Sequence, residues 1–214
     1  MSASPYPVPP GTLILHDGGM ASLLVCGVCR EAALLGAGEK GTPAAVGAVL
    51  FASAPSRGRA AAVLRQCEQL GIPVHDQPPV SFEVPLPQRE AHELLHATHG
   101  AASLGYERVL WPASGALGDS IDLDRVAAIA DRALLIGRLV ALDARTPGGH
   151  NVPGIHIEAP YADFTDRQIA DLVCDMELPV DTCWFWHAGE HDAEAERERR
   201  RWESALGAVG WTRG

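Results

Sequence analysis

The stretch TLILHDGGMAS, residues 12–22, decides how this chain of 214 residues folds. Residues 12–15 form a short apolar run that is typical of a buried strand in a parallel sheet. The pair Gly18-Gly19 ends this run, and residues 20–35 then carry apolar side chains all round, with Gly36 and Gly38 as signals for the end of a helix. A strand that turns tightly into a helix is the unit from which parallel α/β sheets are built.

The same alternation of strand and helix continues along the chain. We expect further strands at residues 45–51, 73–75, 108–111 and 155–158, and helices at 59–70, 90–104, 124–142, 165–176 and 192–206. Proline- and glycine-rich loops are expected at 78–87 and 146–154. The pattern predicts an α/β fold in three layers, with a mostly parallel sheet, as a single domain over residues 12–214. A proline-rich, flexible arm is expected over residues 1–11.

Composition excludes several classes of function. The formal net charge of −10 disfavours a partner bound through nucleic-acid backbone contacts, so no direct nucleic-acid binding is expected. The basic run at residues 197–201 is interleaved with glutamates. We expect it to form a solvent-exposed helix face on which arginines and glutamates form ion pairs. No apolar run is long enough for a membrane span, and residues 1–10 lack the pattern of a secretory signal. Five scattered cysteines do not suggest a disulfide framework. We therefore expect a cytoplasmic protein without a membrane partner, with a homodimer as one alternative for its oligomeric state.

The Gly-Gly loop, residues Asp17–Ser22, is a candidate anion site. Glycines allow a backbone to turn tightly and approach a ligand, and the start of the helix offers unpaired N–H groups. The alternative is that Asp17 only caps the helix after a tight turn. Ligands of such sheets bind at the carboxyl ends of strands, so the residues at Asp17, Ala52 and Pro112 form the candidate rim.

Further stretches carry a family resemblance. Residues 158–169 read EAPYADFTDRQI, residues 177–179 read ELP, and residues 182–186 read TCWFW. Together with the Gly-Gly loop, and with PQRE at 87–90 before Leu104-Gly105, these stretches resemble 7-cyano-7-deazaguanine synthase in order and spacing. That family belongs to the PP-loop superfamily, or N-type ATP pyrophosphatases. The resemblance implies the adenine nucleotide alpha hydrolase-like fold.

The resemblance also implies a function and a set of site residues. The family is an ATP-dependent carbon–nitrogen ligase of the queuosine precursor pathway, which adenylates a carboxylate and releases pyrophosphate. ATP and magnesium are thus the implied cofactors, and a small-molecule purine or nucleotide is the implied partner. The implied nucleotide-binding residues are Asp17, Gly18, Gly19, Met20 and Ser22 at the phosphate end, Phe51 and Ala52 at the base, and Arg89, Trp111 and Pro112 around them.

The departures from the family pattern fall on its chemistry. The first serine of the family loop is Asp17 here, its aspartate is Ala21, and a basic residue after the Pro-x-x-Asp-x-Thr stretch is Asp166. An ionised aspartate cannot donate a hydrogen bond to a phosphate oxygen, and its charge opposes a triphosphate. We therefore expect a purine- or nucleotide-binding pseudoenzyme, with ATP-dependent chemistry lost or altered and no catalytic residue assigned. The alternatives are an active enzyme in which Asp17 holds a metal, and a protein-interaction scaffold.

No zinc is expected, because the cysteine cluster of the family is missing from residues 190–201. Cys183, His187 and His191 recur at intervals of four and would suit zinc on a helix. The alternative is that the aromatic residues 184–186 pack in the core and that the histidines after them lie on the surface. The remaining residues of metal-ligand type are expected to be structural: Cys26 and Cys29 as small hydrophobes, and His92, His96 and His99 as a polar helix face.

Overall fold

The computed structural model describes residues 11–36, 45–51, 57–76, 86–143, 154–189 and 192–212. Residues 1–10 of the expected arm, most of both expected loops, Ala52 and His191 lie outside these ranges. The strands are β1 (Thr12–His16), β2 (Val46–Leu50), β3 (Val74–His75), β4 (Arg108–Leu110), β5 (Ala116–Leu117), β6 (Ser120–Ile121) and β7 (His156–Glu158). The helices are α1 (Met20–Gly36), α2 (Arg57–Leu70), α3 (Leu86–Ser103), α4 (Leu123–Asp143), α5 (Asp166–Asp175) and α6 (Ala193–Ala208), with 3-10 turns η1 (Val180–Thr182) and η2 (Trp184–Trp186).

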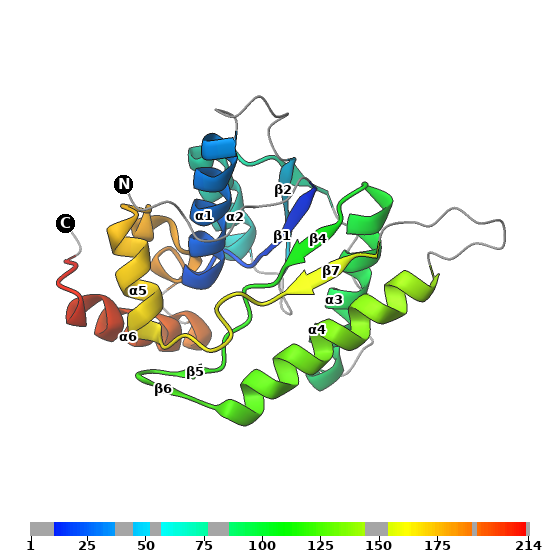
Figure 1. The fold of residues 1–214 in the computed structure, drawn as a ribbon. Coiled ribbons are helices and arrows are strands. Elements are labelled where there is room, and N and C mark those ends of the chain that lie inside the picture. Colours follow the sequence, from blue (N-terminus) through cyan, green and yellow to red (C-terminus); the bar gives the residue numbers. More distant parts are fainter. Residues whose placement is uncertain are drawn as a thin grey trace.

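Five strands form a parallel sheet in the order β3-β2-β1-β4-β7 (Figure 1). The α/β class and the parallel sheet expected from the sequence are therefore confirmed. The sequence did not predict the small antiparallel pair β5-β6, which lies between β4 and α4. Strands this short carry too few residues to show an alternating pattern.

Helices cover both faces of the sheet. Ile14 of β1 faces a cluster of apolar residues from α1, α2, α5, α6 and the two 3-10 turns. Its neighbours Leu13 and Leu15 face the opposite cluster, which α3 and α4 complete. Every residue of β1 is buried, as expected of a central parallel strand with helices on both sides. Among the described residues, no helix is long and apolar enough to cross a membrane.

The stretch around Thr165 that carries part of the family resemblance has a clear structural role. The Thr165 hydroxyl accepts a hydrogen bond from the backbone N–H of Gln168, and the Gln168 side chain accepts one from the backbone N–H of Thr165. This reciprocal capping box fixes the start of α5. It also places Asp166, the first residue of the helix, in the interior, where its side chain is 2% exposed.

The strand order reverses between β1 and β4. The chain runs from β1 outward to β2 and β3, then returns to add β4 on the other side of β1. At such a reversal the loops leaving the two central strands diverge, which leaves a crevice at their carboxyl ends. The Gly-Gly loop leaves β1 and residues 111–115 leave β4 at this edge.

Candidate functional site

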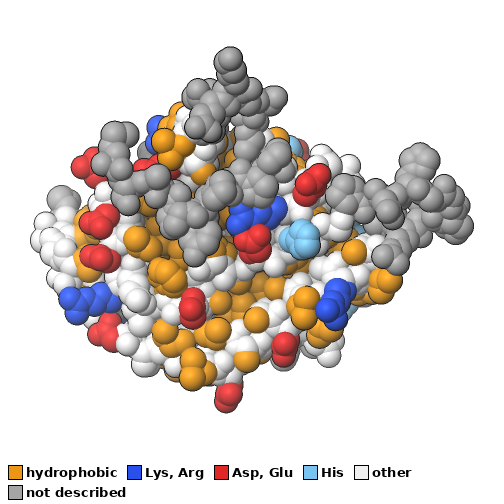
Figure 2. Space-filling model, viewed as in Figure 1, with side chains coloured by type: hydrophobic (Ala, Val, Ile, Leu, Met, Phe, Trp, Pro, Cys, Tyr) orange, Lys and Arg blue, Asp and Glu red, His pale blue; other side chains and the backbone are white. Residues whose placement is uncertain are grey.

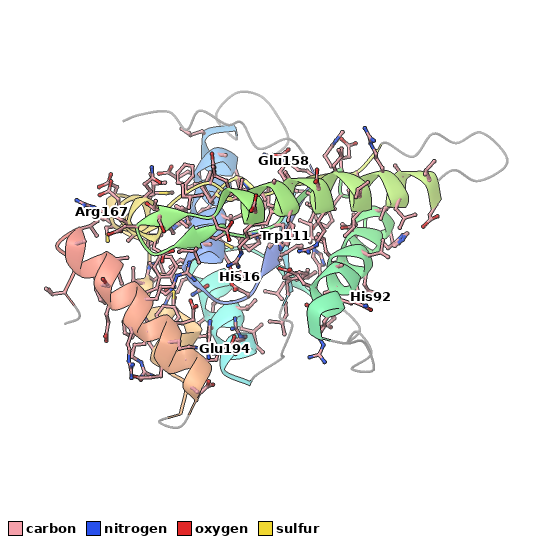
Figure 3. All side chains as sticks on the ribbon, turned by 90° about the horizontal axis from the view of Figure 1, so that it is seen from below. His16, His92, Trp111, Glu158, Arg167 and Glu194 are labelled. Atoms are coloured by element: carbon pink, nitrogen blue, oxygen red, sulfur yellow. The ribbon has the colours of Figure 1, made fainter. Side chains whose placement is uncertain are left out.

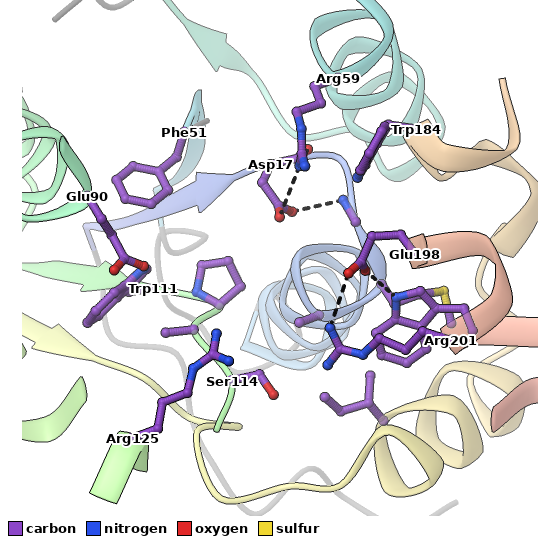
Figure 4. A pocket seen from close by; sticks show the side chains of 17 residues that line it. Asp17, Phe51, Arg59, Glu90, Trp111, Ser114, Arg125, Trp184, Glu198 and Arg201 are labelled. Atoms are coloured by element: carbon purple, nitrogen blue, oxygen red, sulfur yellow. Dashed lines mark hydrogen bonds and ion pairs between the residues drawn. The ribbon is translucent and has the colours of Figure 1, made fainter. Parts of the chain in front are cut away.

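A cavity of about 230 Å³ lies at this reversal of strand order (Figure 4). The loops after β1, β2 and β4 form its floor, and side chains from α2 to α6 and from η2 form its walls. Its lining residues are Asp17, Gly19, Met20, Ala21, Phe51, Arg59, Glu90, Trp111, Pro112, Ala113, Ser114, Arg125, Ile169, Trp184, Glu198, Arg201 and Trp202.

Gly18 sets the path of the Gly-Gly loop. Its φ of 77° lies in the left-handed region that favours glycine, and a Cβ there would lie 3.0 Å from the Cβ of Ala62. The Gly18 carbonyl accepts hydrogen bonds from the backbone N–H of Trp184 and the side chain of Gln66. Two segments distant in sequence thus hold the loop in place from behind.

The carboxylate of Asp17 is bound by its own loop. Oδ1 accepts a hydrogen bond of 2.8 Å from the backbone N–H of Gly19 and a second one from the Ser22 hydroxyl. The alternative that Asp17 serves the helix start therefore has direct support, since this N–H belongs to the residue just before α1. The buried Ser22 hydroxyl points to this carboxylate. An internal anion thus already uses the donors that a phosphate would need.

Arg59 compensates the charge of Asp17. Its guanidinium lies 3.6 Å from the Asp17 carboxylate, donates to Glu194 Oε1 at 2.7 Å, and stacks 3.9 Å from the centre of the Trp184 ring. The Arg59 side chain is 11% exposed, so these contacts fix it firmly against the wall of the cavity. Cation–π stacking of this kind is common for arginine on tryptophan.

Arg201 compensates Asp166 in the same way. Its guanidinium donates two hydrogen bonds of 2.6 Å to the two oxygens of the buried Asp166 carboxylate. The expectation of a solvated face at residues 197–201 is wrong for Arg201, because tertiary packing of α6 on α5 turns this side chain inward. Arg200 does behave as expected and pairs with Glu196. The two aspartates that depart from the family pattern are therefore each matched by an arginine.

The opposite wall is aromatic and carries the remaining polar groups. Phe51 and Trp111 follow β2 and β4, the strands on either side of β1. Glu90 accepts a hydrogen bond of 2.8 Å from Arg132. In the described part of the chain, no carboxylate pairs with the guanidinium of Arg125, which lies beside Ser114 at the rim (Figure 4).

The structure brings most of the expected site residues together. Asp17, Gly19, Met20, Phe51, Trp111 and Pro112 line the cavity. Gly18 and Ser22 belong to the loop but lie behind its surface, and Arg89 lies on α3 near Glu93, outside the lining. The sequence interpretation missed Arg59, Arg125 and Arg201, because no local pattern links these helices to the Gly-Gly loop.

A second group of reactive side chains lies behind the loop, and we call it the thiol–imidazole cluster. The potential ligand atoms of His16, Cys26 and Cys67 lie within 4.8 Å of one another, and all three residues are buried. His16 Nδ1 accepts the backbone N–H of Gly18 at 3.1 Å. The proton of the neutral ring is therefore on Nε2, which has no nitrogen or oxygen partner. While Nδ1 accepts this hydrogen bond, Nε2 offers no lone pair to a metal.

The pKa values of the two cysteines in this cluster are shifted in opposite directions. Burial raises the pKa of Cys26 well above its ordinary value. The pKa of Cys67 is lowered to about 5, because Cys26 shares a hydrogen bond with its sulfur and His16 lies beside it. Neither thiol reaches solvent, so the two side chains pack α1 against α2 in the core and offer no exposed nucleophile.

Elsewhere in the described part of the chain, residues of metal-ligand type do not gather. The Cys183 sulfur lies in the core, 3.5 Å from Met20 Sδ, and burial raises its pKa. His187 is exposed and its Nε2 bonds to the Asp181 carbonyl at 2.7 Å. Residues 184–186 form a 3-10 turn of buried aromatic side chains, so Cys183 and His187 do not share the face of an α-helix. His92 lies on the exposed side of α3, away from His16 and Trp111 in the interior (Figure 3).

No protein-family model matches the chain, and a search of curated proteins finds no match either.

Proposed function

We propose that the protein binds a purine base, nucleoside or nucleoside monophosphate in this cavity and no longer uses ATP as a PP-loop enzyme does. The observation that carries the proposal is the position of the Asp17 carboxylate. The carboxylate accepts hydrogen bonds from the Gly19 N–H and the Ser22 hydroxyl and forms an ion pair with Arg59. These are the groups that would otherwise bind a phosphate. A triphosphate at the loop would have to displace this internal anion.

The walls support a flat heteroaromatic ligand. Phe51 and Trp111 add small aromatic surfaces to the lining, 9% and 2% exposed, and contact of a base with an aromatic side chain contributes about 1–3 kcal/mol where the rings stack. Glu90 adds a carboxylate acceptor, which suits the N–H groups of a purine edge. The cavity of about 230 Å³ lies below the ~300–1,000 Å³ of pockets for drug-sized ligands, which favours a base or nucleoside over ATP.

Arg125 supports recognition of a single phosphate. It is a lining guanidinium with no ion-pair partner among the described residues, and it lies on the side of the cavity opposite Arg59. The side chain of Ser114 lies next to it, and its oxygen accepts the backbone N–H of Ala116, which leaves its hydroxyl proton free to donate. A monophosphate at the rim would meet both donors without contact with the Asp17 carboxylate.

The PP-loop relationship is part of the proposal. The order β3-β2-β1-β4-β7, the Gly-Gly loop after the central strand and the stretch at residues 158–169 all agree with it. The rival in which Asp17 holds a metal has less support, because its carboxylate already accepts two hydrogen bonds and faces an arginine.

A ligand series tests this function. Thermal shift and calorimetry with 7-deazaguanine, AMP, ADP and ATP, each with and without magnesium, should show binding of the base and of AMP. Affinity should not increase from AMP to ATP, and magnesium should have little effect. Tightest binding of magnesium–ATP, with pyrophosphate released in the presence of a carboxylate substrate, would support an active enzyme instead.

A further inference from the structure

The outer side of α4 is unusually apolar for a surface helix. Five of its leucines are exposed: Leu123 at 75%, Leu135 at 63%, Leu142 at 61%, Leu134 at 52% and Leu139 at 44%. The buried side of the helix, centred on Ala133 and Val140, packs on the sheet and α3. Figure 2 shows apolar side chains gathered along the lower part of the molecule, where α4 runs in Figure 1.

The exposed leucines form a stripe opposite the buried side. At 100° per residue, Leu135 and Leu142 lie within about 40° of Asp131, while Ala133 and Val140 lie on the other side of the helix. We call this surface the α4 stripe, and it consists of Ala127, Ala128, Asp131, Leu134, Leu135, Arg138 and Leu142, with Ala130 and Leu139 on its two opposite margins. A patch of this kind on a folded domain marks an interaction surface.

The order of residues along the α4 stripe is self-complementary. If two copies of α4 cross antiparallel about a two-fold axis between Leu134 and Leu135, each of these leucines meets the other on the partner helix. The same register places Asp131 opposite Arg138 of the second copy. Neither Asp131 nor Arg138 has an ion-pair partner within its own chain among the described residues.

Side-chain size follows the same register. Ala127 would face Leu142 of the second copy, and both lie within about 30° of the centre of the stripe. A small residue opposite a large one lets two helices approach to about 8–10 Å while their side chains interdigitate. Charge, shape and hydrophobicity therefore agree on one antiparallel arrangement, and a two-fold axis forms each of these contacts twice.

We propose that a second copy of this chain docks on the α4 stripe, to form a two-fold symmetric homodimer through antiparallel α4 helices. The occupant is a copy of the chain because the pattern complements itself. This inference does not depend on the proposed ligand. A single pair of helices is a small interface, so we expect a dissociation constant in the micromolar range.

Sedimentation velocity over a range of concentrations tests the dimer on the full chain. Leu135→Glu places two carboxylates at the centre of the interface and should weaken association about 30-fold or more. Leu64→Glu is the matched control, because Leu64 is a similarly exposed leucine on α2, at 58%, and should leave the dimer intact. Melting temperatures of both variants check that the fold is retained.

Charge reversal tests the register. Asp131→Arg and Arg138→Asp should each weaken the dimer, because each places like charges opposite one another twice. The double variant, Asp131→Arg with Arg138→Asp, should restore association to near the wild-type level. A wild-type chain that stays monomeric at about 100 μM, well above a micromolar dissociation constant, would overturn the proposal. A dimer insensitive to Leu135→Glu would overturn it as well, and failure of the double variant to recover would refute the antiparallel register.

Discussion

Replacing Asp17 by asparagine or serine separates the two roles of its carboxylate in the Gly-Gly loop. The carboxylate accepts hydrogen bonds from Gly19 N–H and Ser22, and it also carries a negative charge toward the cavity. Asparagine keeps an acceptor oxygen at the same reach but removes the charge. Serine removes the charge and most of the reach, which frees the Gly19 N–H for a ligand.

The expected gain in affinity follows from the electrostatics. A phosphate charge about 4 Å from the carboxylate is repelled by about 1 kcal/mol at the dielectric constant of water, and by about 4 kcal/mol at an effective value of 20. The Asp17 side chain is 39% exposed, so solvent screening favours the lower figure. Relief of about 1 kcal/mol tightens binding of a nucleotide phosphate about fivefold.

Calorimetric titration of AMP and ADP into wild type, Asp17→Asn and Asp17→Ser measures this gain. Both variants should bind ADP, whose second phosphate extends toward the Gly-Gly loop, about fivefold or more tightly, while AMP, with its phosphate at Arg125, and 7-deazaguanine should change little. Stability should fall by about 1 kcal/mol or less in Asp17→Asn, since Arg59 keeps its contact with Glu194. The control is Asp171→Asn, an exposed acid on α5 outside the cavity lining. If neither Asp17 variant binds ADP more tightly than wild type, the carboxylate does not obstruct the loop and the reasoning fails.

Arg125→Ala should weaken AMP about tenfold and leave 7-deazaguanine unchanged, because a charged hydrogen bond to phosphate is worth about 1.5–3 kcal/mol; equal losses for both ligands in calorimetry would contradict a phosphate role. Arg201→Met should cost about 3–5 kcal/mol in urea unfolding, since it leaves the buried Asp166 charge unpaired, and adding Asp166→Asn should recover most of the loss. Burial raises the pKa of Glu93, so the folded state binds its proton more tightly than the unfolded state does and stability falls as pH rises above the ordinary value of about 4.3. Glu93→Gln should therefore stabilise the protein by ~1 kcal/mol at pH 7 and flatten this part of the pH profile, and an unchanged profile would argue against the buried charge. Elemental analysis of the purified protein should find no stoichiometric zinc, whereas about one zinc per chain would contradict this expectation.

Local sequence patterns were sufficient for most of the fold. Short runs of three to seven residues located the five strands of the sheet, and helical patterns, three of them ended by a glycine, located all six helices in the described ranges. The hairpin at residues 116–121 escaped prediction because each of its strands has two residues. Short elements of this kind are fixed by tertiary contacts, here the hydrogen bonds of Gly115 to Ala162 and of Asp166 to Gly118.

The site was predictable only where it lies on strand ends. Asp17, Phe51 and Trp111 follow strands, so a parallel sheet brings them to one edge whatever the details of packing. Arg59 and Arg201 reach the same place from helices, and their aspartate partners are 42 and 35 residues away in sequence. Judged from the loop sequence alone, Asp17 and Asp166 are uncompensated charges, while the folded chain pairs each with an arginine.

The most direct test of the proposed function is a crystal structure of the protein soaked with 7-deazaguanine and, separately, with AMP. We predict a ring against the cavity wall at Phe51 and Trp111, a phosphate at Arg125 and Ser114, and the Asp17 carboxylate still bonded to Gly19 N–H. A phosphate seated on the Gly-Gly loop in place of that carboxylate would contradict the account. An empty cavity at saturating ligand would likewise contradict it and favour a scaffold without a bound purine.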